Sequence, residues 1–97
     1  MLTLPIKKKW FDMIKSGEKK EEYREIKPYY ESRFFNQFKL NNHETKFDVI
    51  FRNGYSKTSP SIKCRVSLYI DYGKPEWGAE SDKEYYVLKI LSVEEIC

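Results

Sequence analysis

The sequence contains one histidine and two cysteines, and it has no long apolar run. His43 lies in a polar loop without a cysteine or carboxylate at ligand spacing, so no metal centre is expected. No Ser-His-Asp arrangement is present, and no cofactor is expected. Two cysteines are too few for a disulfide scaffold. We therefore interpret Cys64 and Cys97 as reduced thiols of a cytoplasmic protein, with Cys64 in the core.

The hydropathy of the chain gives no indication of a membrane partner. No stretch approaches the ~20 apolar residues that a membrane span requires, and the mean hydropathy is −0.74. The N-terminal lysines follow a short apolar run, whereas a secretory signal carries its charges before a longer one. With 97 residues, 40% of them hydrophobic and 16% aromatic, residues 1–97 are expected to form a single domain.

The net charge of +3 is unevenly distributed along the chain. Residues 1–24 hold seven basic and four acidic side chains, and residues 52–65 hold four basic side chains and no acid. Residues 71–84 hold five acids and two lysines. A basic lobe attracts an anion such as a phosphate backbone. The alternative is that these charges only keep a small protein in solution.

The hydrophobic pattern predicts five strands and two helices. Their order is strand, helix, strand, helix and three strands, at residues 2–6, 6–16, 20–26, 29–37, 47–51, 62–70 and 85–93. Loops are expected at residues 39–46, 55–61 and 73–82. In the last strand, odd-numbered and even-numbered positions are both apolar, which predicts burial on both faces. This order favours an α+β fold, in which a small sheet curls into a barrel of about five or six strands.

The most informative segment follows the first helix, where Gly17, Lys19, Glu22 and Arg24 have the spacing GxKxxExR. Glu22 and Arg24 are two residues apart on a strand, so they lie on one face, roughly 6–7 Å apart. Lys19 lies at the entrance of the strand and reaches the same space. Burial and a nearby arginine lower the pKa of a lysine, whereas a carboxylate raises it. A lowered pKa is one route to a lysine base or nucleophile. The alternative is a surface salt-bridge ladder.

Other segments supply candidate contacts for a ligand. Tyr55 lies within the basic stretch 52–65, where a ring can stack on a base and cations can contact phosphate, unless this is an ordinary hairpin loop. Asn53 and Gly54 form a turn whose amides can also line a pocket. Trp77 either stacks over the pocket or fills the end of a barrel. The aromatic residues of the two helices are assigned to the core: Trp10, Tyr29, Tyr30, Phe34 and Phe35.

The segment from Trp10 and Ile14 to Arg24 resembles the signature of the ASCH domain, a member of the PUA-like superfamily. In that pattern a helix with an apolar stripe ends in a glycine, and GxKxxExR opens a strand. Three later segments are similar to small ASCH proteins of phage and bacterial genomes: Arg52-Asn53-Gly54-Tyr55, Glu76-Trp77-Gly78 and Tyr85-Tyr86-Val87-Leu88. The resemblance covers nearly the whole chain. It implies a twisted β-barrel with an N-terminal helix at its mouth and a cleft lined by the signature residues.

PUA-like domains commonly bind RNA or modified bases, so the preferred hypothesis is recognition of a nucleotide or of an exposed base in RNA. In this hypothesis Lys19 and Arg24 hold a phosphate or a carbonyl, and Glu22 accepts hydrogen bonds from a base edge. Tyr55 or Trp77 stacks on the base, because base–aromatic stacking stabilises such complexes.

The second hypothesis is a hydrolase. Some small ASCH proteins are similar to amidohydrolases that remove acyl groups from cytidine with a lysine, a threonine and a glutamate, and another has ribonuclease activity. Lys19 falls on the lysine position, Glu22 occupies the threonine position, and Glu76 or Glu80 corresponds to the acid. A lysine and two carboxylates can activate a water. The third hypothesis is a phage-type interaction module that uses no pocket.

Overall fold

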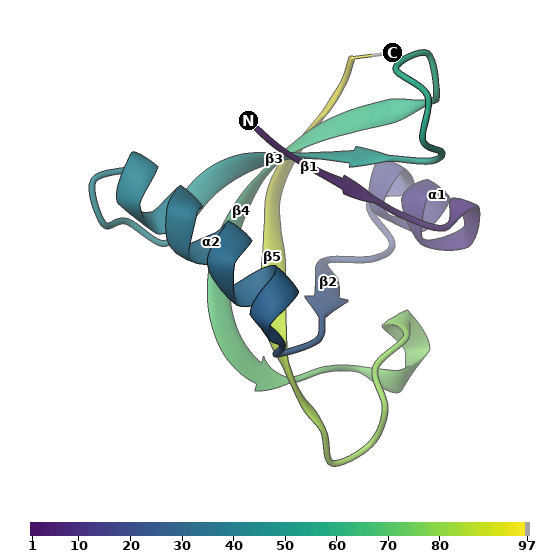
Figure 1. Cartoon of the computed structure of the whole chain (residues 1–97). Helices are drawn as coiled ribbons and strands as arrows, with labels where there is room; N and C mark the ends of the chain where they lie inside the picture. Colours follow the sequence, from purple (N-terminus) through teal and green to yellow (C-terminus); the bar gives the residue numbers. More distant parts are fainter. Residues whose placement is uncertain (97) are drawn as a thin grey trace.

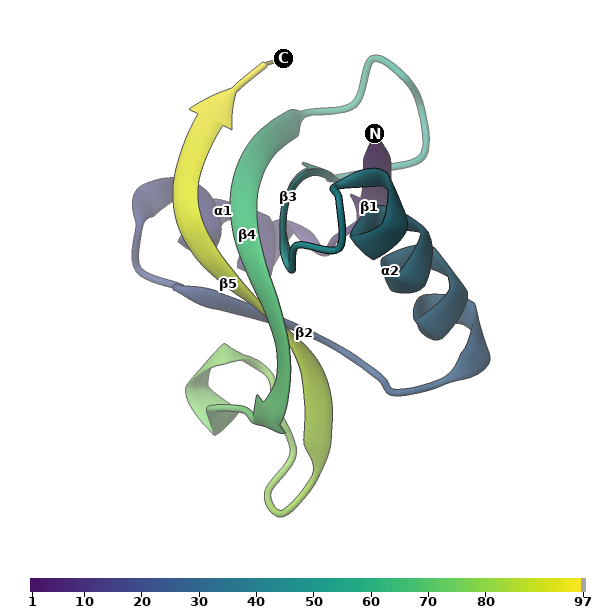
Figure 2. The ribbon, with the colours of Figure 1, turned by 90° about the vertical axis from the view of Figure 1, so that its left-hand side faces the viewer.

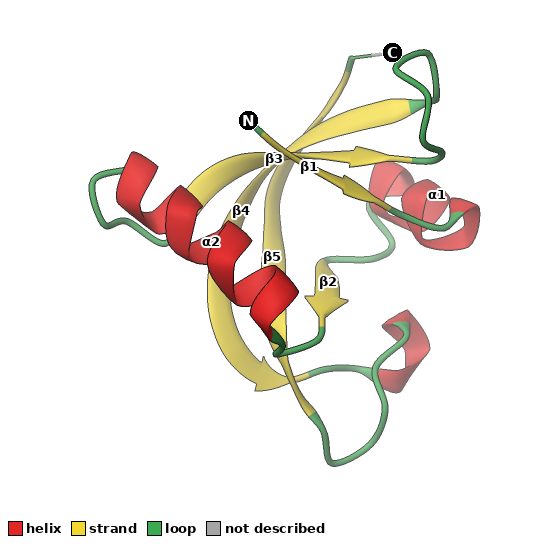
Figure 3. Ribbon diagram, in the orientation of Figure 1, coloured by secondary structure: helices red, strands yellow, loops and turns green. Residues whose placement is uncertain are grey.

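The computed structural model describes residues 1–96 and contains five strands and two α-helices in the order that the hydrophobic pattern predicts. The elements are β1 (Leu2–Pro5), α1 (Lys8–Ser16), β2 (Glu21–Arg24), α2 (Pro28–Leu40), β3 (Lys46–Arg52), β4 (Ser61–Tyr72), the 3-10 turn η1 (Pro75–Trp77) and β5 (Glu84–Glu95) (Figure 3). Cys97, interpreted as a thiol, lies outside the described residues. Across residues 1–96, no helix has both the length and the apolar character needed to cross a bilayer.

The strands form one mixed sheet in the order β1-β3-β4-β5-β2. β1 runs parallel to β3, and the other neighbouring strands are antiparallel. The 12-residue strands β4 and β5 bend along their length, with a bulge between Arg65 and Val66, and the sheet curls into a half-barrel (Figures 1 and 2). The expected α+β class is confirmed. The sheet is a half-barrel because β1 and β2 remain its two edges.

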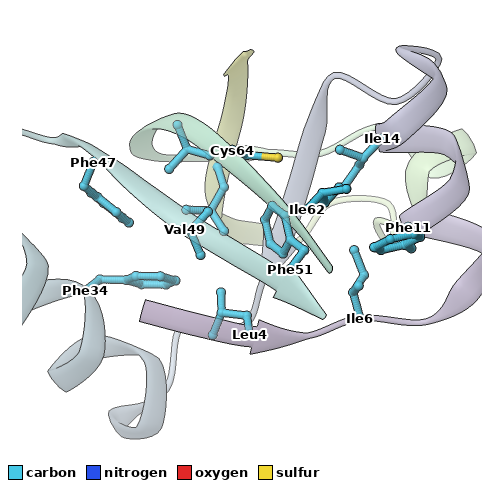
Figure 4. Close-up of a cluster of buried hydrophobic side chains, with 12 residues drawn as sticks. Leu4, Ile6, Phe11, Ile14, Phe34, Phe47, Val49, Phe51, Ile62 and Cys64 are labelled. Carbon is cyan, nitrogen blue, oxygen red and sulfur yellow. The ribbon is translucent and has the colours of Figure 1, made fainter. Parts of the chain in front are cut away.

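The core lies between the sheet and the two helices (Figure 4). Its central side chains are Phe11 and Ile14 of α1, Phe34 of α2, Phe47, Val49 and Phe51 of β3, and Ile62, Cys64 and Val66 of β4. The period-2 alternation predicts the buried face of β3 correctly, and that of β4 as far as Val66. The same face of β4 was expected to include Leu68 and Ile70, but Leu68 is only partly buried and Ile70 is exposed, because both lie beyond the residues that pair with β3. Cys64 is fully buried, as expected, and this burial raises the pKa of its thiol to about 12.

The expectation that the last strand is buried on both faces is wrong for its second half. The first half of β5 contains buried residues such as Val87 and Leu88, whereas Leu91 and Val93 are exposed. β2 pairs with residues 86–89 alone, so β5 becomes an edge strand beyond this point. A strand with apolar residues at both odd and even positions therefore does not reveal how far its neighbour in the sheet extends.

The second helix is longer and less buried than expected. α2 continues through Leu40, into the segment that was expected to be a loop. Phe34 is buried and Tyr30 is partly buried, but Tyr29 and Phe35 are exposed, contrary to their assignment to the core. The reason is geometric: a surface helix buries only the stripe that faces the sheet. Tyr30 and Phe34 stand one turn apart on that stripe, and their rings stack.

Candidate functional site

The end of α1 directs Lys19 into the protein interior. Gly17 adopts a left-handed conformation with φ +87° and donates its N–H to Ile14 O, which ends the helix. The backbone N–H of Lys19 then donates to Met13 O at 2.9 Å, so the chain folds back beneath the helix. Only 1% of Lys19 and 5% of Glu22 is exposed to solvent. The spacing of the motif thus produces two buried charged residues beside each other.

Glu22 is the carboxylate that joins the two cations of this site. Its Oε1 accepts a hydrogen bond from Lys19 Nζ at 2.7 Å, and its Oε2 accepts one from Arg24 Nη2 at 2.7 Å. The three charged groups therefore meet at Glu22 in the interior, and the alternative prediction of a surface salt-bridge ladder is wrong. We call these three residues the ion cluster. Charged residues are rarely buried, and those that are buried are usually paired, as they are here. A buried cluster of three charged side chains is therefore an unusual feature of so small a core.

The amino group of Lys19 is held on three sides. Besides Glu22, its Nζ donates to the backbone carbonyl of Trp77 at 2.8 Å and lies 4.3 Å from the centre of the Trp10 ring. Burial lowers the pKa of Lys19; the charge of Arg24 acts in the same direction, and Glu22 opposes both. The sequence left open whether the pKa of Lys19 is raised or lowered. Desolvation is the largest effect, and the net pKa is lowered.

Arg24 connects the ion cluster to two other elements. Its Nη2 donates to Pro5 O at 2.9 Å, at the end of β1, and its Nη1 donates to the hydroxyl of Tyr30 in α2 at 3.2 Å. Its Nε is buried and has no hydrogen-bond partner within residues 1–96. A buried donor without a partner is costly. The Nε–H of Arg24 is therefore a buried donor that none of residues 1–96 satisfies.

The ion cluster opens into a pocket of about 460 Å³, which we call the main pocket. It is lined by Pro5, Ile6, Lys7, Trp10, Lys19, Glu22, Tyr23, Arg24, Glu25, Lys27, Tyr30, Trp77, Gly78, Glu80, Lys83 and Tyr85. Five of these residues are basic and three are acidic, so the lining carries a net positive charge. Aromatic rings from both helices, η1 and β5 complete its walls. The pocket thus combines cations, one central carboxylate and flat apolar surfaces.

The structure brings together most of the predicted site residues, but not all of them. Trp77 and Glu80 line the main pocket with the ion cluster, whereas Glu76 is absent from its lining. Asn53 and Tyr55 line a separate hollow of about 310 Å³, which we call the side pocket. Of the two candidate acids, only Glu80 therefore lines the pocket into which the cluster opens.

Sequence reasoning missed several residues of the main pocket. Trp10 was assigned to the core, yet it is only partly buried and its ring contacts Lys19. Tyr30 was assigned to the core as well, and its hydroxyl binds Arg24. Lys7 and Lys27 carried no signal, because each flanks a helix and resembles a solvated lysine. The polar tips of the aromatic residues, which usually find a partner when buried, were the available signal for Tyr30.

Among residues 1–96, no group of three histidine, cysteine or acidic side chains is arranged to hold a metal ion. No family model, no curated protein and no solved structure matches this chain.

Proposed function

We propose that this protein binds a nucleotide, or an exposed base of RNA, in the main pocket. The observation that carries the proposal is the buried ion cluster, which opens into a hollow walled by aromatic rings. A volume of about 460 Å³ lies within the range of roughly 300–1,000 Å³ that is typical of small-molecule sites. The proposal includes the ASCH domain of the PUA-like superfamily, which the motif resembles, as the family of the chain.

Each part of a nucleotide has a matching group in this pocket. A carboxylate has about four acceptor sites, and the two cations use one on each oxygen of Glu22. The remaining sites can accept N–H groups from a base edge. The ring of Trp77 offers a stacking surface, and Lys7 and Lys27 place positive charge at the rim for a phosphate.

A hydrolase acting on acylated cytidine or on RNA is the second candidate, and the lowered pKa of Lys19 favours it. The contacts of Lys19 favour binding instead. Its Nζ is buried and already bound to Glu22 and Trp77 O, so it cannot approach a substrate carbon without breaking both hydrogen bonds. Among residues 1–96, no serine, threonine, cysteine or histidine belongs to the lining. A hydrolase built on this pocket would therefore use Glu22 or Glu80 to activate a water.

A ligand panel with one pair of variants tests the proposal. Nucleosides and nucleoside monophosphates are titrated into the protein, and Tm and NMR chemical shifts are recorded. A ligand that binds only the folded state raises Tm. Trp77→Ala removes the ring but keeps the carbonyl that binds Lys19, and it is expected to weaken binding about tenfold. Tyr72→Ala serves as the control, because Tyr72 is exposed and lies outside the main pocket.

Three outcomes separate the hypotheses. Acylated cytidine and RNA are also incubated with the protein, and their products are separated by chromatography. Binding without turnover supports the proposal. Release of free acid or of shortened RNA replaces it with the hydrolase. Absence of binding by every nucleotide, or an equal loss in Trp77→Ala and Tyr72→Ala, overturns it and leaves the interaction module.

A further inference from the structure

The side pocket lies directly against the main pocket. It is lined by Pro5, Ile6, Lys7, Asn53, Gly54 and Tyr55. The first three of these residues also line the main pocket. The segment 5–7 is therefore a wall with one hollow on each side, and any polymer that fills both hollows must pass over it.

The parallel pairing of β1 and β3 produces this arrangement. Pro5 pairs with Arg52, and Ile6 N–H donates to Arg52 O at 3.0 Å. Because parallel strands end at the same edge of a sheet, the residues that follow Pro5 and those that follow Arg52 emerge next to each other. On the opposite side of the wall, Arg24 Nη2 donates to Pro5 O at 2.9 Å. The wall is thus held by Arg52 of β3 and by Arg24 of β2.

The side pocket presents an exposed ring and one cation. Tyr55 is 93% exposed, the highest value among the exposed large hydrophobic residues. Gly54 has φ +128°, and a Cβ at this position would collide with Ser59, so the turn that presents Tyr55 requires glycine. Lys7 is the only charged residue among those that line the side pocket, and it also lines the main pocket. It forms no ion pair with any of residues 1–96.

We propose that the two pockets together hold two consecutive nucleotides of a single-stranded nucleic acid. One base enters the main pocket, the next base stacks on Tyr55, and the phosphate between them lies at Lys7. The side-chain amide of Asn53 offers a donor and an acceptor to the second base. This inference rests on the proposed function and specifies its ligand: the natural occupant is an oligonucleotide strand and not a free mononucleotide.

Matched titrations with mononucleotides and dinucleotides test the inference. UMP, UpU, AMP and ApA, together with their deoxyribose counterparts, are titrated into the protein and followed by NMR. We expect each preferred dinucleotide to bind about tenfold or more tightly than its mononucleotide, because a second base gains a stacking partner. Tyr55→Ala is expected to abolish this advantage and to leave mononucleotide affinity unchanged. Tyr55→Phe is expected to retain it, and Tyr72→Ala is the control for loss of an exposed tyrosine outside both pockets.

The role of Lys7 has its own readout. If Lys7 contacts the linking phosphate, Lys7→Ala weakens dinucleotide binding. It also makes the negative slope of log K against log salt less steep by about 0.7, the value for one phosphate contact in a single strand. Lys39→Ala, on α2 and outside both pockets, serves as the control and leaves the slope unchanged.

The possible results distinguish this inference from the function on which it rests. Equal affinity for every mononucleotide and its dinucleotide, or an unchanged advantage in Tyr55→Ala, overturns the two-nucleotide site and leaves the main pocket as a mononucleotide site. Absence of binding by all eight ligands overturns both. A dinucleotide advantage confined to ribose or to deoxyribose supports the inference and identifies the strand as RNA or DNA.

Discussion

At the residue scale, Glu22 is the group on which the site depends. It is the sole carboxylate that contacts both Lys19 and Arg24 within residues 1–96. A buried ion pair is weak as a source of stability, since both charges lose water, but removal of one partner leaves the other charge unpaired. Here one carboxylate balances two cations. The cluster therefore retains a net positive charge, which suits an anionic ligand.

Glu22→Gln is expected to destabilise the protein by about 3–5 kcal/mol, the cost of breaking a buried pair from one side. The amide keeps the shape of the side chain but leaves two buried cations without a counter-charge. Urea unfolding at neutral pH measures the effect, with ΔG extrapolated to water. Asp12→Asn is the control, because it removes a carboxylate that pairs with Lys8 at the surface and should change ΔG little. Similar ΔG values for the two variants would contradict this account of the cluster.

At the element scale, the loop that contains η1 is fastened to the rest of the site. The carbonyl of Trp77 accepts the hydrogen bond from Lys19, and Gly78 packs against the ring of Trp10. Gly78 has φ +101°, and a Cβ there would lie 3.0 Å from Trp10 Cζ2. This glycine is needed for its conformation and for its small size. A short turn therefore helps to form the pocket wall and to hold Lys19.

Gly78→Ala is expected to destabilise the protein and to weaken ligand binding, because the new methyl group must displace Trp10 or the turn. Gly17→Ala is the matched control. Gly17 also has positive φ, but its Cβ would meet only Lys20 Nζ, at 3.6 Å. Gly17→Ala should thus cost only the backbone penalty of about 1–2 kcal/mol. Gly78→Ala should cost about 1–3 kcal/mol more because of overpacking.

Urea unfolding and nucleotide titration of both glycine variants provide the measurement. Nucleotide affinity should fall in Gly78→Ala and stay unchanged in Gly17→Ala. If both variants lose the same stability and keep the same affinity, the contact between Gly78 and Trp10 has no role in forming the pocket.

The helical and strand patterns explain which elements could be predicted from the sequence. The alternation of Phe47, Val49 and Phe51 predicts β3 and its buried face, because this strand has a core on one side. The same reasoning failed for β5, whose exposure depends on the short length of β2. Periodicity indicates the secondary structure and the apolar face of one segment. It cannot report the length or the position of the segment that packs against it.

At the scale of the whole molecule, the sheet has a seam between its two edge strands. β1 and β2 do not pair, and the guanidinium of Arg24 reaches across from β2 to Pro5 O at the end of β1. The same side chain binds Glu22 and Tyr30. The main pocket therefore lies where the half-barrel remains open, and one arginine links its two sides.

Arg24→Lys is expected to destabilise the protein by about 2 kcal/mol, since a lysine cannot reproduce the forked contacts and one charge-assisted hydrogen bond or more is lost. The loss should be local. Hydrogen exchange should accelerate at the amides of β1 and β2 more than at those of β3. Arg33→Lys is the control, because Arg33 Nη1 donates only to Tyr29 O within α2. Uniform acceleration across the sheet would contradict a role of Arg24 at the seam.

The site itself was only partly predictable from the sequence. The spacing of Lys19, Glu22 and Arg24 indicated that their charged groups would meet, because local geometry sets that distance. The contributions of Pro5 and of the Trp77 carbonyl were not predictable. They are backbone oxygens, so residue type carries no signal, and both come from segments that are distant in the sequence.

The placement of the indole side chains has a practical consequence. Trp10 and Trp77 are the only tryptophans in the chain, and both line the main pocket. Emission excited selectively at tryptophan, and not at the eight tyrosines, therefore originates at the main pocket and serves as a built-in optical reporter of occupancy. A compound that enters the main pocket should quench or shift this emission without any label, whereas one that settles elsewhere should leave the spectrum unchanged.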